Sequence, residues 1–337
     1  MRRRRPVAEL SGLYVSSLRL WKGMVIMGVR EFYLELAERI RKKGQAEVIT
    51  VLWGPDRGKK YFSEEKALEK MTAEEEVHHE VLYGRPKAAI LGGGHVSFEL
   101  AKVLKLLDLH VTVADSREEF ANSERFPGCQ VCCGDLGQWL EETPAAAFGY
   151  YIILTRGHKE DGLCLRKILK KKYEYVGMIG SRSKVAQTLE KLRKDGFSEE
   201  KLQEVHAPVG LPIKAQTPGE IAVSIGAEII QVKNQVPRLI LEKEVAEAIK
   251  DQEFQVIATI IEKKGSSPRG AGTRMVIAPS GKIRGTIGGG AVEAAAIDYG
   301  KKMTKAFDVQ EYSLNNEAAA GLGMICGGRV KVMFEKL

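Results

Sequence analysis

The feature that most constrains this chain is a glycine-rich turn that joins a short apolar segment to an amphipathic one, AAILGGGHVSFEL, starting at residue 88. The spacing predicts a strand before Gly92 and a helix after Gly94, and the next apolar stretch ends at Asp115. In a dinucleotide-binding fold the first glycine makes the turn, the second lets the backbone approach a pyrophosphate, and the acidic residue accepts a hydrogen bond from a ribose hydroxyl. The pattern therefore predicts a site for a nucleotide or another phosphorylated ligand; the alternative is a fold that kept the turn and lost the nucleotide. The residues expected at this site are Gly92, Gly94, His95 and Asp115.

The surrounding sequence alternates short apolar strands with helix-like stretches. The strands AAIL, HVTVAD, YYIILT and YVGMIG are each followed by a segment with helical spacing, such as VSFELAKVLKLL or SKVAQTLEKLRKDG. This alternation is typical of a parallel, doubly wound sheet. After Lys243 the order changes to helix, strand, glycine-rich loop, strand and a second glycine-rich loop that opens a helix. We therefore expect an α/β protein with a Rossmann-like doubly wound parallel sheet and a smaller α+β module.

The length of 337 residues also favours two cores. Residues 31–53 have the same helix–strand layout as the start of the C-terminal module, so that Thr50 aligns with Thr259 and Val48 with Ile257. This similarity indicates a degenerate second copy of the module, or chance between two amphipathic segments. The expected organisation is a disordered extension at 1–26, a helix–strand segment at 27–83, the Rossmann-like domain at 84–234 and the α+β module at 240–337.

Charge and composition exclude several classes of protein. The net charge is +8, but residues 1–26 contribute +5 of it, and the remaining +3 is too small to indicate nucleic-acid binding. No apolar run reaches the roughly 20 residues that a membrane span needs. The five cysteines are odd in number and clustered, which argues against a disulfide framework and favours the cytoplasm. The CQVCC run lacks a second ligand pair for zinc, so we expect core cysteines and no metal site.

Polar residues follow the later strands directly. The segments TRGHKED and GSRSK come straight after two of them, and open α/β sheets build their sites at the carboxyl ends of the strands. Helix capping explains the serines, but the basic residues are suited to neutralising phosphate. The residues expected on this edge are Asp135, Arg156, His158, Asp161, Ser181 and Arg182.

Two glycine-rich loops of the C-terminal module, GSSPRGAGTRM and GTIGGGAVEAAAID, are suited to pointing main-chain N–H groups at an anion. A cysteine beside two further glycines, in GMICGGRV, is suited to a soft metal or sulfur ligand, and a buried structural cysteine is the alternative. The residues expected here are Gly265, Ser266, Ser267, Arg269, Arg274, Gly288, Gly289, Gly290, Glu293 and Cys326.

These motifs together resemble the XdhC/CoxI family of maturation factors for xanthine and carbon-monoxide dehydrogenases. The resemblance covers roughly residues 80–337 and rests on motifs in a consistent order: GGGHV, ADSREEFAN, TRGHKED, YVGMIGSRSK, HAPVGLPI, TPGEIAVSIGAEI, GSSPRGAGTRM, GTIGGGAVE and GMICGGRV. In the usual layout of the family the GSSPR/GGG module precedes the Rossmann module. Here the complete module comes second.

The resemblance implies a cytoplasmic chaperone, a cofactor carrier more than a catalyst, that binds the molybdenum cofactor (molybdopterin). It implies sulfuration of that cofactor with a cysteine desulfurase and delivery to an apo-hydroxylase of the xanthine dehydrogenase type. It also implies a pterin phosphate near Arg269 and Arg274 and an indirect contact of Cys326 with molybdenum or sulfur. Because the module order differs from the usual layout, we expect a homodimer that restores the pairing of the two modules. The alternatives are an NAD(P)-dependent oxidoreductase that uses the Rossmann site and a nucleotide-handling transferase that acts on the pterin phosphate.

Overall fold

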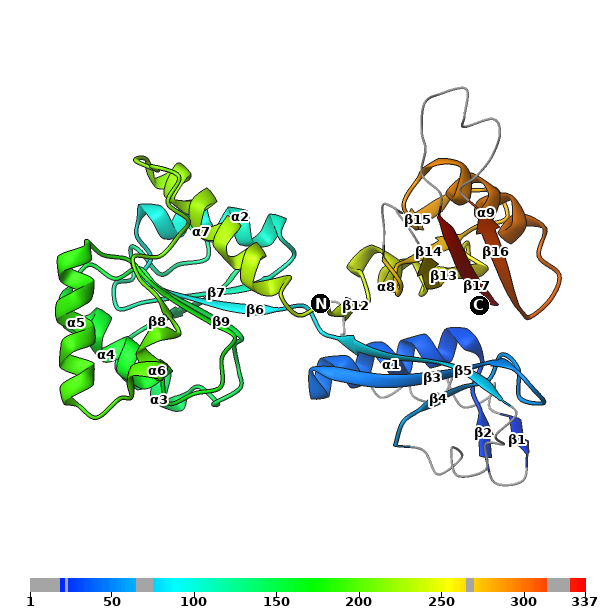
Figure 1. The fold of residues 1–337 in the computed structure, drawn as a ribbon, viewed down its shortest axis with the longest axis horizontal. Helices are drawn as coiled ribbons and strands as arrows, with labels where there is room; N and C mark the ends of the chain where they lie inside the picture. Colours follow the sequence, from blue (N-terminus) through cyan, green and yellow to red (C-terminus); the bar gives the residue numbers. More distant parts are fainter. Residues whose placement is uncertain (1–18, 22–23, 65–74, 265–269, 314–327) are drawn as a thin grey trace, which may run out of the picture. The chain divides into compact units, whose positions relative to one another are not determined.

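A computed structural model describes residues 19–21, 24–64, 75–264, 270–313 and 328–337. The chain divides into two compact units (Figure 1). The central unit is Arg85–Pro237, and the terminal unit combines the two ends of the chain, up to Gly84 and from Arg238 onward. The segment expected at 27–83 therefore belongs to the same compact unit as the C-terminal module.

The central unit is built on a six-stranded parallel sheet in the order β8-β7-β6-β9-β10-β11. This is the strand order 3-2-1-4-5-6 of the doubly wound dinucleotide-binding fold. The predicted doubly wound sheet is confirmed. Its strands are β6 (Lys87–Leu91), β7 (His110–Asp115), β8 (Gln130–Cys133), β9 (Tyr150–Ile153), β10 (Tyr175–Met178) and β11 (Val205–His206).

Helices cover both faces of this sheet (Figure 1). One face packs against α2 and α7, and the other against α3, α4, α5 and α6. Because both faces are covered, the inner strands β6, β7, β9 and β10 are buried along nearly their whole length instead of at alternate residues. The helices are α2 (His95–Leu106), α3 (Leu136–Glu142), α4 (His158–Ile168), α5 (Arg182–Lys194), α6 (Glu199–Gln203) and α7 (Pro218–Lys233).

The terminal unit contains a four-stranded sheet, β12-β5-β3-β4, and a five-stranded sheet, β15-β14-β13-β17-β16. Strand β12 pairs in parallel with β5, so the chain returns from the central unit beside the strand from which it left. The elements of the first part are β1 (Arg19–Trp21), β2 (Met24–Ile26), α1 (Val29–Lys43), β3 (Gln45–Trp53), β4 (Lys60–Phe62), β5 (Glu76–Tyr83) and β12 (Leu239–Ile240). Those of the second part are α8 (Lys243–Ala248), β13 (Val256–Lys264), β14 (Arg274–Ile277), β15 (Ile283–Gly285), α9 (Gly290–Lys302), β16 (Phe307–Ser313) and β17 (Arg329–Lys336).

Both ends of the chain contribute to one hydrophobic core in the terminal unit. Phe32 and Val48 from the N-terminal segment are buried in the same cluster as Val245 and Ile257 from the C-terminal module. The guanidinium of Arg30 adds a polar link, because it donates to the main-chain carbonyls that follow α8, including that of Phe254 at 2.6 Å. The N-terminal segment is thus part of the fold of the C-terminal module.

A buried charge cluster, formed by Tyr33, Lys60, Glu80, Arg274 and Glu335, crosses this core. Lys60 contacts Glu335 at 2.9 Å and Arg274 bonds to Glu80, so each cation pairs with an acid from the other end of the chain. The hydroxyl of Tyr33 donates to Glu335 at 2.9 Å.

The two sheets place these charges at equivalent positions. Lys60 lies opposite Thr50 in one sheet and Arg274 lies opposite Thr259 in the other. In the same way Glu80 lies opposite Val48, and Glu335 lies opposite Ile257. These registers coincide with the sequence alignment of the two helix–strand segments.

In the part of the chain that the structure describes, no helix has both the length and the apolar character needed to span a bilayer.

Candidate ligand crevice of the central unit

A pocket of about 290 Å³ opens at the carboxyl edge of the parallel sheet. It lies where β6 has β7 on one side and β9 on the other, which is the switch point of the fold and its usual ligand site. We call this pocket the crevice. Its lining residues are Gly92, Asp115, Ser116, Arg117, Leu136, Thr155, Arg156 and Glu160.

The glycine turn forms one wall of the crevice. Gly92 has φ of +102°, and a Cβ on it would lie 2.5 Å from the carbonyl oxygen of Leu154, so only glycine fits this position. Gly94 is the N-cap of α2, and nothing lies within 4 Å of where its Cβ would be. His95 is the exposed first residue of the helix. The first glycine therefore makes the turn, and the backbone at the second is open to approach.

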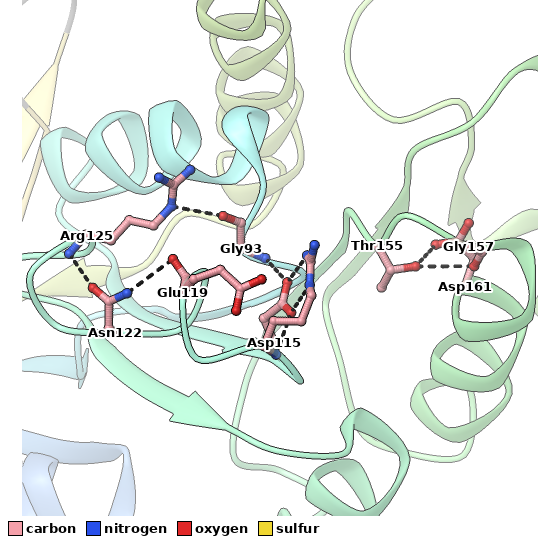
Figure 2. Close-up of polar contacts among 9 residues, drawn as sticks. Gly93, Asp115, Glu119, Asn122, Arg125, Thr155, Gly157 and Asp161 are labelled. Carbon is pink, nitrogen blue, oxygen red and sulfur yellow. Dashed lines mark hydrogen bonds and ion pairs between the residues drawn. The ribbon is translucent and has the colours of Figure 1, made fainter.

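Asp115, at the end of β7, is buried and accepts hydrogen bonds on both carboxylate oxygens (Figure 2). The main-chain N–H groups of Gly93 and Arg117 donate at 2.7 and 3.0 Å. The guanidinium of Arg117 donates twice, from Nε at 2.9 Å and Nη2 at 2.8 Å. Burial alone would raise the pKa of Asp115, but the hydrogen bonds from Arg117 and Gly93 outweigh it and hold that pKa below its usual value. The carboxylate expected to accept from a ribose is thus already saturated by its own chain.

Three arginines surround the ring of Phe120 beside the crevice. The guanidinium carbon lies 3.9 Å from the ring centroid for Arg117, 4.8 Å for Arg156 and 5.4 Å for Arg125. Arg125 also donates from Nε to the carbonyl oxygen of Gly93 at 3.2 Å (Figure 2). Arg117, Phe120 and Arg125 were not predicted as site residues. Their position in the loop that follows the strand ending at Asp115 was the available signal.

The predicted site residues in the turn after β9 have two different roles. Arg156 is exposed, lines the crevice and forms no hydrogen bond or ion pair with a residue that the structure describes. Asp161 is buried, and its carboxylate accepts from the hydroxyl of Thr155 at 2.5 Å (Figure 2). It therefore holds the entry into α4 together and does not present its charge to a ligand. His158 is the first residue of α4, and its side chain lies outside the described part.

The other residues predicted on this edge act as helix caps or lie at helix starts. Asp135 accepts from the N–H of Gln138 at 2.7 Å and caps α3. Ser181 accepts from the N–H of Lys184 at 3.4 Å and caps α5, whose exposed first residue is Arg182. The residues that line the crevice do not include these three.

In the terminal unit, Arg274 differs from the expectation of a phosphate ligand. Its side chain is only 2% exposed, and its guanidinium donates to Glu80 and, at 2.7 Å, to the carbonyl oxygen of Gly272. Burial would lower the pKa of Arg274, but the charge of Glu80 outweighs it and raises that pKa. The guanidinium is therefore part of the core. The predicted residues Gly265, Ser266, Ser267, Arg269 and Cys326 lie outside the described residues.

The second glycine-rich turn is also bonded to its own chain. Gly288, Gly289 and Gly290 have φ of +120°, +75° and +69°, and α9 begins at Gly290. The carboxylate of Glu293 accepts from the N–H groups of Ile287 at 3.0 Å and Gly289 at 3.1 Å, and from the hydroxyl of Thr286. Burial would raise the pKa of Glu293, but these hydrogen bonds hold it below its usual value. An internal carboxylate thus takes the place expected for an external anion.

The cysteines of the CQVCC run lie on and just before the edge strand β8. Cys129 and Cys132 are half-buried against the cores on opposite faces of the sheet, and Cys133 is exposed. Among the described residues, no group of three or more His, Cys, Asp or Glu side chains could hold a metal ion.

The strand order, the glycine turn and the acid after the second strand define a dinucleotide-binding class of fold. Family comparison makes this specific. Residues 89–229 match the XdhC Rossmann domain, and residues 248–312 match the XdhC and CoxI family. The two matches together cover more than half of the chain, which belongs to the XdhC/CoxI family with the Rossmann domain first.

Individual relatives agree with this membership. The chain is 36% identical over 155 residues to the protein YqeB of Escherichia coli (strain K12), in an alignment that covers 45% of this chain and 28% of that protein. It is 27% identical over 153 residues to a probable xanthine dehydrogenase subunit of Bacillus subtilis (strain 168), with 45% and 44% covered. The chain thus spans less than half the length of these relatives. A solved Bacillus halodurans structure described as a xanthine dehydrogenase shares the fold, with a TM-score of 0.50 at 19% identity over 60% of this chain and 66% of that one.

Proposed function

We propose that this protein is an accessory factor for a molybdenum hydroxylase of the xanthine dehydrogenase type. In this proposal it binds the molybdenum cofactor, assists its sulfuration with a cysteine desulfurase, and delivers it to the apo-enzyme. Family membership and the name of the Bacillus subtilis relative support the partner. The observation that carries the proposal is the crevice, where a glycine turn and Arg156 meet at the switch point of an XdhC Rossmann domain.

The crevice fits the phosphate of such a cofactor. A side chain on Gly92 would collide with the main chain, whereas the backbone at Gly94 is open where α2 begins. Main-chain N–H groups at a helix N-terminus bind phosphate, and Arg156 adds a positive charge that forms no ion pair with a described residue. Arg156 on the wall of the crevice would therefore hold the phosphate, together with the main-chain N–H groups of Gly94 and His95, which lie beyond the lining residues at the start of α2.

The crevice suits the phosphate better than the C-terminal loops do. There, Arg274 is bonded to Glu80 and the carboxylate of Glu293 occupies the turn at Gly289. When bound, the cofactor supplies the molybdenum centre that the hydroxylase uses. The part of this chain is to grip the phosphate and, with the buried side chain of Leu136 on the wall, to limit access of water.

The test is co-expression with molybdopterin synthesis, purification without air, and oxidation of the protein-bound pterin to its fluorescent product. We expect pterin in the wild-type protein and a loss of roughly tenfold in Arg156→Ala, because a charged hydrogen bond to phosphate is removed. Arg193→Ala is the matched control, since Arg193 lies in the last turn of α5 and pairs with Glu199 at 2.8 Å. Protein that stays free of pterin, or equal losses in both variants, would overturn the proposal.

A second candidate is an NAD(P)-dependent oxidoreductase, which the strand order and Asp115 favour. Isothermal titration of the purified protein with NAD, NADP and molybdopterin separates the two. Binding of NAD or NADP with no pterin bound, together with oxidation of a hydride-donating substrate by the bound nucleotide, would favour the oxidoreductase.

A further inference from the structure

The crevice contains a feature that the proposed function does not use: the bidentate bond between Arg117 and Asp115. In a dinucleotide-binding fold, the acid at this position accepts hydrogen bonds from ribose. Here the Nε and Nη2 atoms of Arg117 donate to the two oxygens of that carboxylate, at 2.9 and 2.8 Å. A guanidinium presents two parallel N–H donors, and a ribose presents two adjacent O–H donors.

We infer that Arg117 is a gate residue that occupies the ribose-diol position of a ribonucleotide site. A ribonucleotide with free 2′- and 3′-hydroxyls binds the crevice only when it displaces this side chain from Asp115. The inference concerns the nucleotide specificity of the crevice and goes beyond the proposed function. The test measures nucleotide binding in the absence of pterin, so the inference about Arg117 and the proposed function can fail independently of each other.

The hydrogen bonds of Asp115 separate into two kinds. Those from the main-chain N–H groups of Gly93 and Arg117 belong to the turn itself and persist whichever group faces the carboxylate. Those from the guanidinium come from a side chain that is 29% exposed and can rotate away. Removing the guanidinium therefore leaves a buried, correctly oriented carboxylate with two free acceptor positions.

The surroundings of the gate supply the rest of a nucleotide site. Phe120 offers a ring on which the Arg117 guanidinium now stacks, at 3.9 Å. Arg156, 4.8 Å from the same ring, remains as a cation for the diphosphate when Arg117 is displaced. The volume of about 290 Å³ is large enough for part of a nucleotide and too small for a whole dinucleotide, which has to extend along the sheet edge.

This arrangement predicts opposite effects for two arginines of one crevice. In Arg117→Ala the free diol gains Asp115 as its acceptor, so ADP is expected to bind roughly tenfold more tightly. In Arg156→Ala the diphosphate loses a cation, so ADP is expected to bind more weakly. A nucleotide with a 2′-phosphate is repelled by an unpaired Asp115, so NADP is expected to lose affinity in Arg117→Ala while NAD gains it.

The experiment is isothermal titration of the full chain with ADP, 2′-deoxy-ADP, NAD and NADP, for the wild type, Arg117→Ala, Arg117→Gln and Arg156→Ala. The Arg117→Gln variant keeps most of the aliphatic stem over Phe120, so it guards against collapse of the turn, and thermal unfolding checks each fold. The expected result is a gain for ADP that 2′-deoxy-ADP does not share. An equal gain for both, unchanged or weaker ADP binding in both Arg117 variants, or no nucleotide binding by any variant would overturn the inference.

Discussion

Two arginine–carboxylate pairs, one in each unit, show how differently the same chemistry is used in this protein. In the central unit Arg117 pairs with Asp115, and the side chains are 29% and 5% exposed. In the terminal unit Arg274 pairs with Glu80, and the side chains are 2% and 1% exposed. The first pair borders a crevice, so a ligand can exchange with its arginine. The second is enclosed by the two sheets and can only hold them together.

The largest expected effect comes from breaking the enclosed pair. Glu80→Ala leaves the guanidinium of Arg274 buried without its acid, and the free energy of unfolding of the terminal unit is expected to fall by about 3–5 kcal/mol. Arg117→Ala removes the arginine of the open pair and is expected to cost at most about 1 kcal/mol, because that guanidinium is partly exposed and the main-chain N–H groups of Gly93 and Arg117 still donate to Asp115. Urea unfolding, followed by hydrogen exchange of individual peptides, measures the unfolding free energy of each unit by itself.

A rescue sharpens this test. Replacing the pair by Glu80→Leu with Arg274→Met removes both charges at once, and stability is expected to return close to that of the wild type. If Glu80→Ala and Arg117→Ala had equal costs, the distinction between an enclosed and an open pair would be wrong.

The pH dependence of the enclosed pair is the next effect in size. Burial alone would raise the pKa of Glu80, but Arg274 and Lys60 outweigh it and hold that pKa below the ordinary 4.5. Because the folded pKa is the lower one, the stabilisation is complete above about pH 4.5 and is lost as the pH falls from there through the folded value. The difference in unfolding free energy between wild type and Glu80→Gln is therefore expected to shrink as the pH falls over the range below about pH 4.5. A difference that stays constant over this range would contradict the ionised pair.

The two pairs also show how far the sequence alone reaches. The Rossmann-like unit was predictable because its signals are local: Gly92 follows a strand directly, and Asp115 ends the next one. The role of Arg274 was not predictable, because its partner Glu80 lies 194 residues earlier in the sequence, before the inserted central unit. A basic residue beside a glycine-rich loop is typical of a phosphate site, and only the pairing of the two chain ends shows that this one is a core residue. Arg117 was missed although it lies two residues from Asp115.

The smallest expected effect concerns the turn at Gly288–Gly290, which has a run of three glycines like the turn beside the crevice. Glu293 accepts N–H groups from a glycine-rich turn, as Asp115 does, but its remaining partner is the hydroxyl of Thr286 instead of an arginine. Glu293→Ala is expected to cost about 1 kcal/mol of unfolding free energy, the size of a lost helix cap, measured by urea unfolding. It also frees the N–H groups of Ile287 and Gly289, so phosphate is expected to restore part of the lost stability in this variant and to have no such effect on the wild type. Equal stabilisation of both proteins by phosphate would mean that the carboxylate of Glu293 does not occupy an anion site. In that case the arginine partner of Asp115 would not be the feature that distinguishes the crevice from this turn.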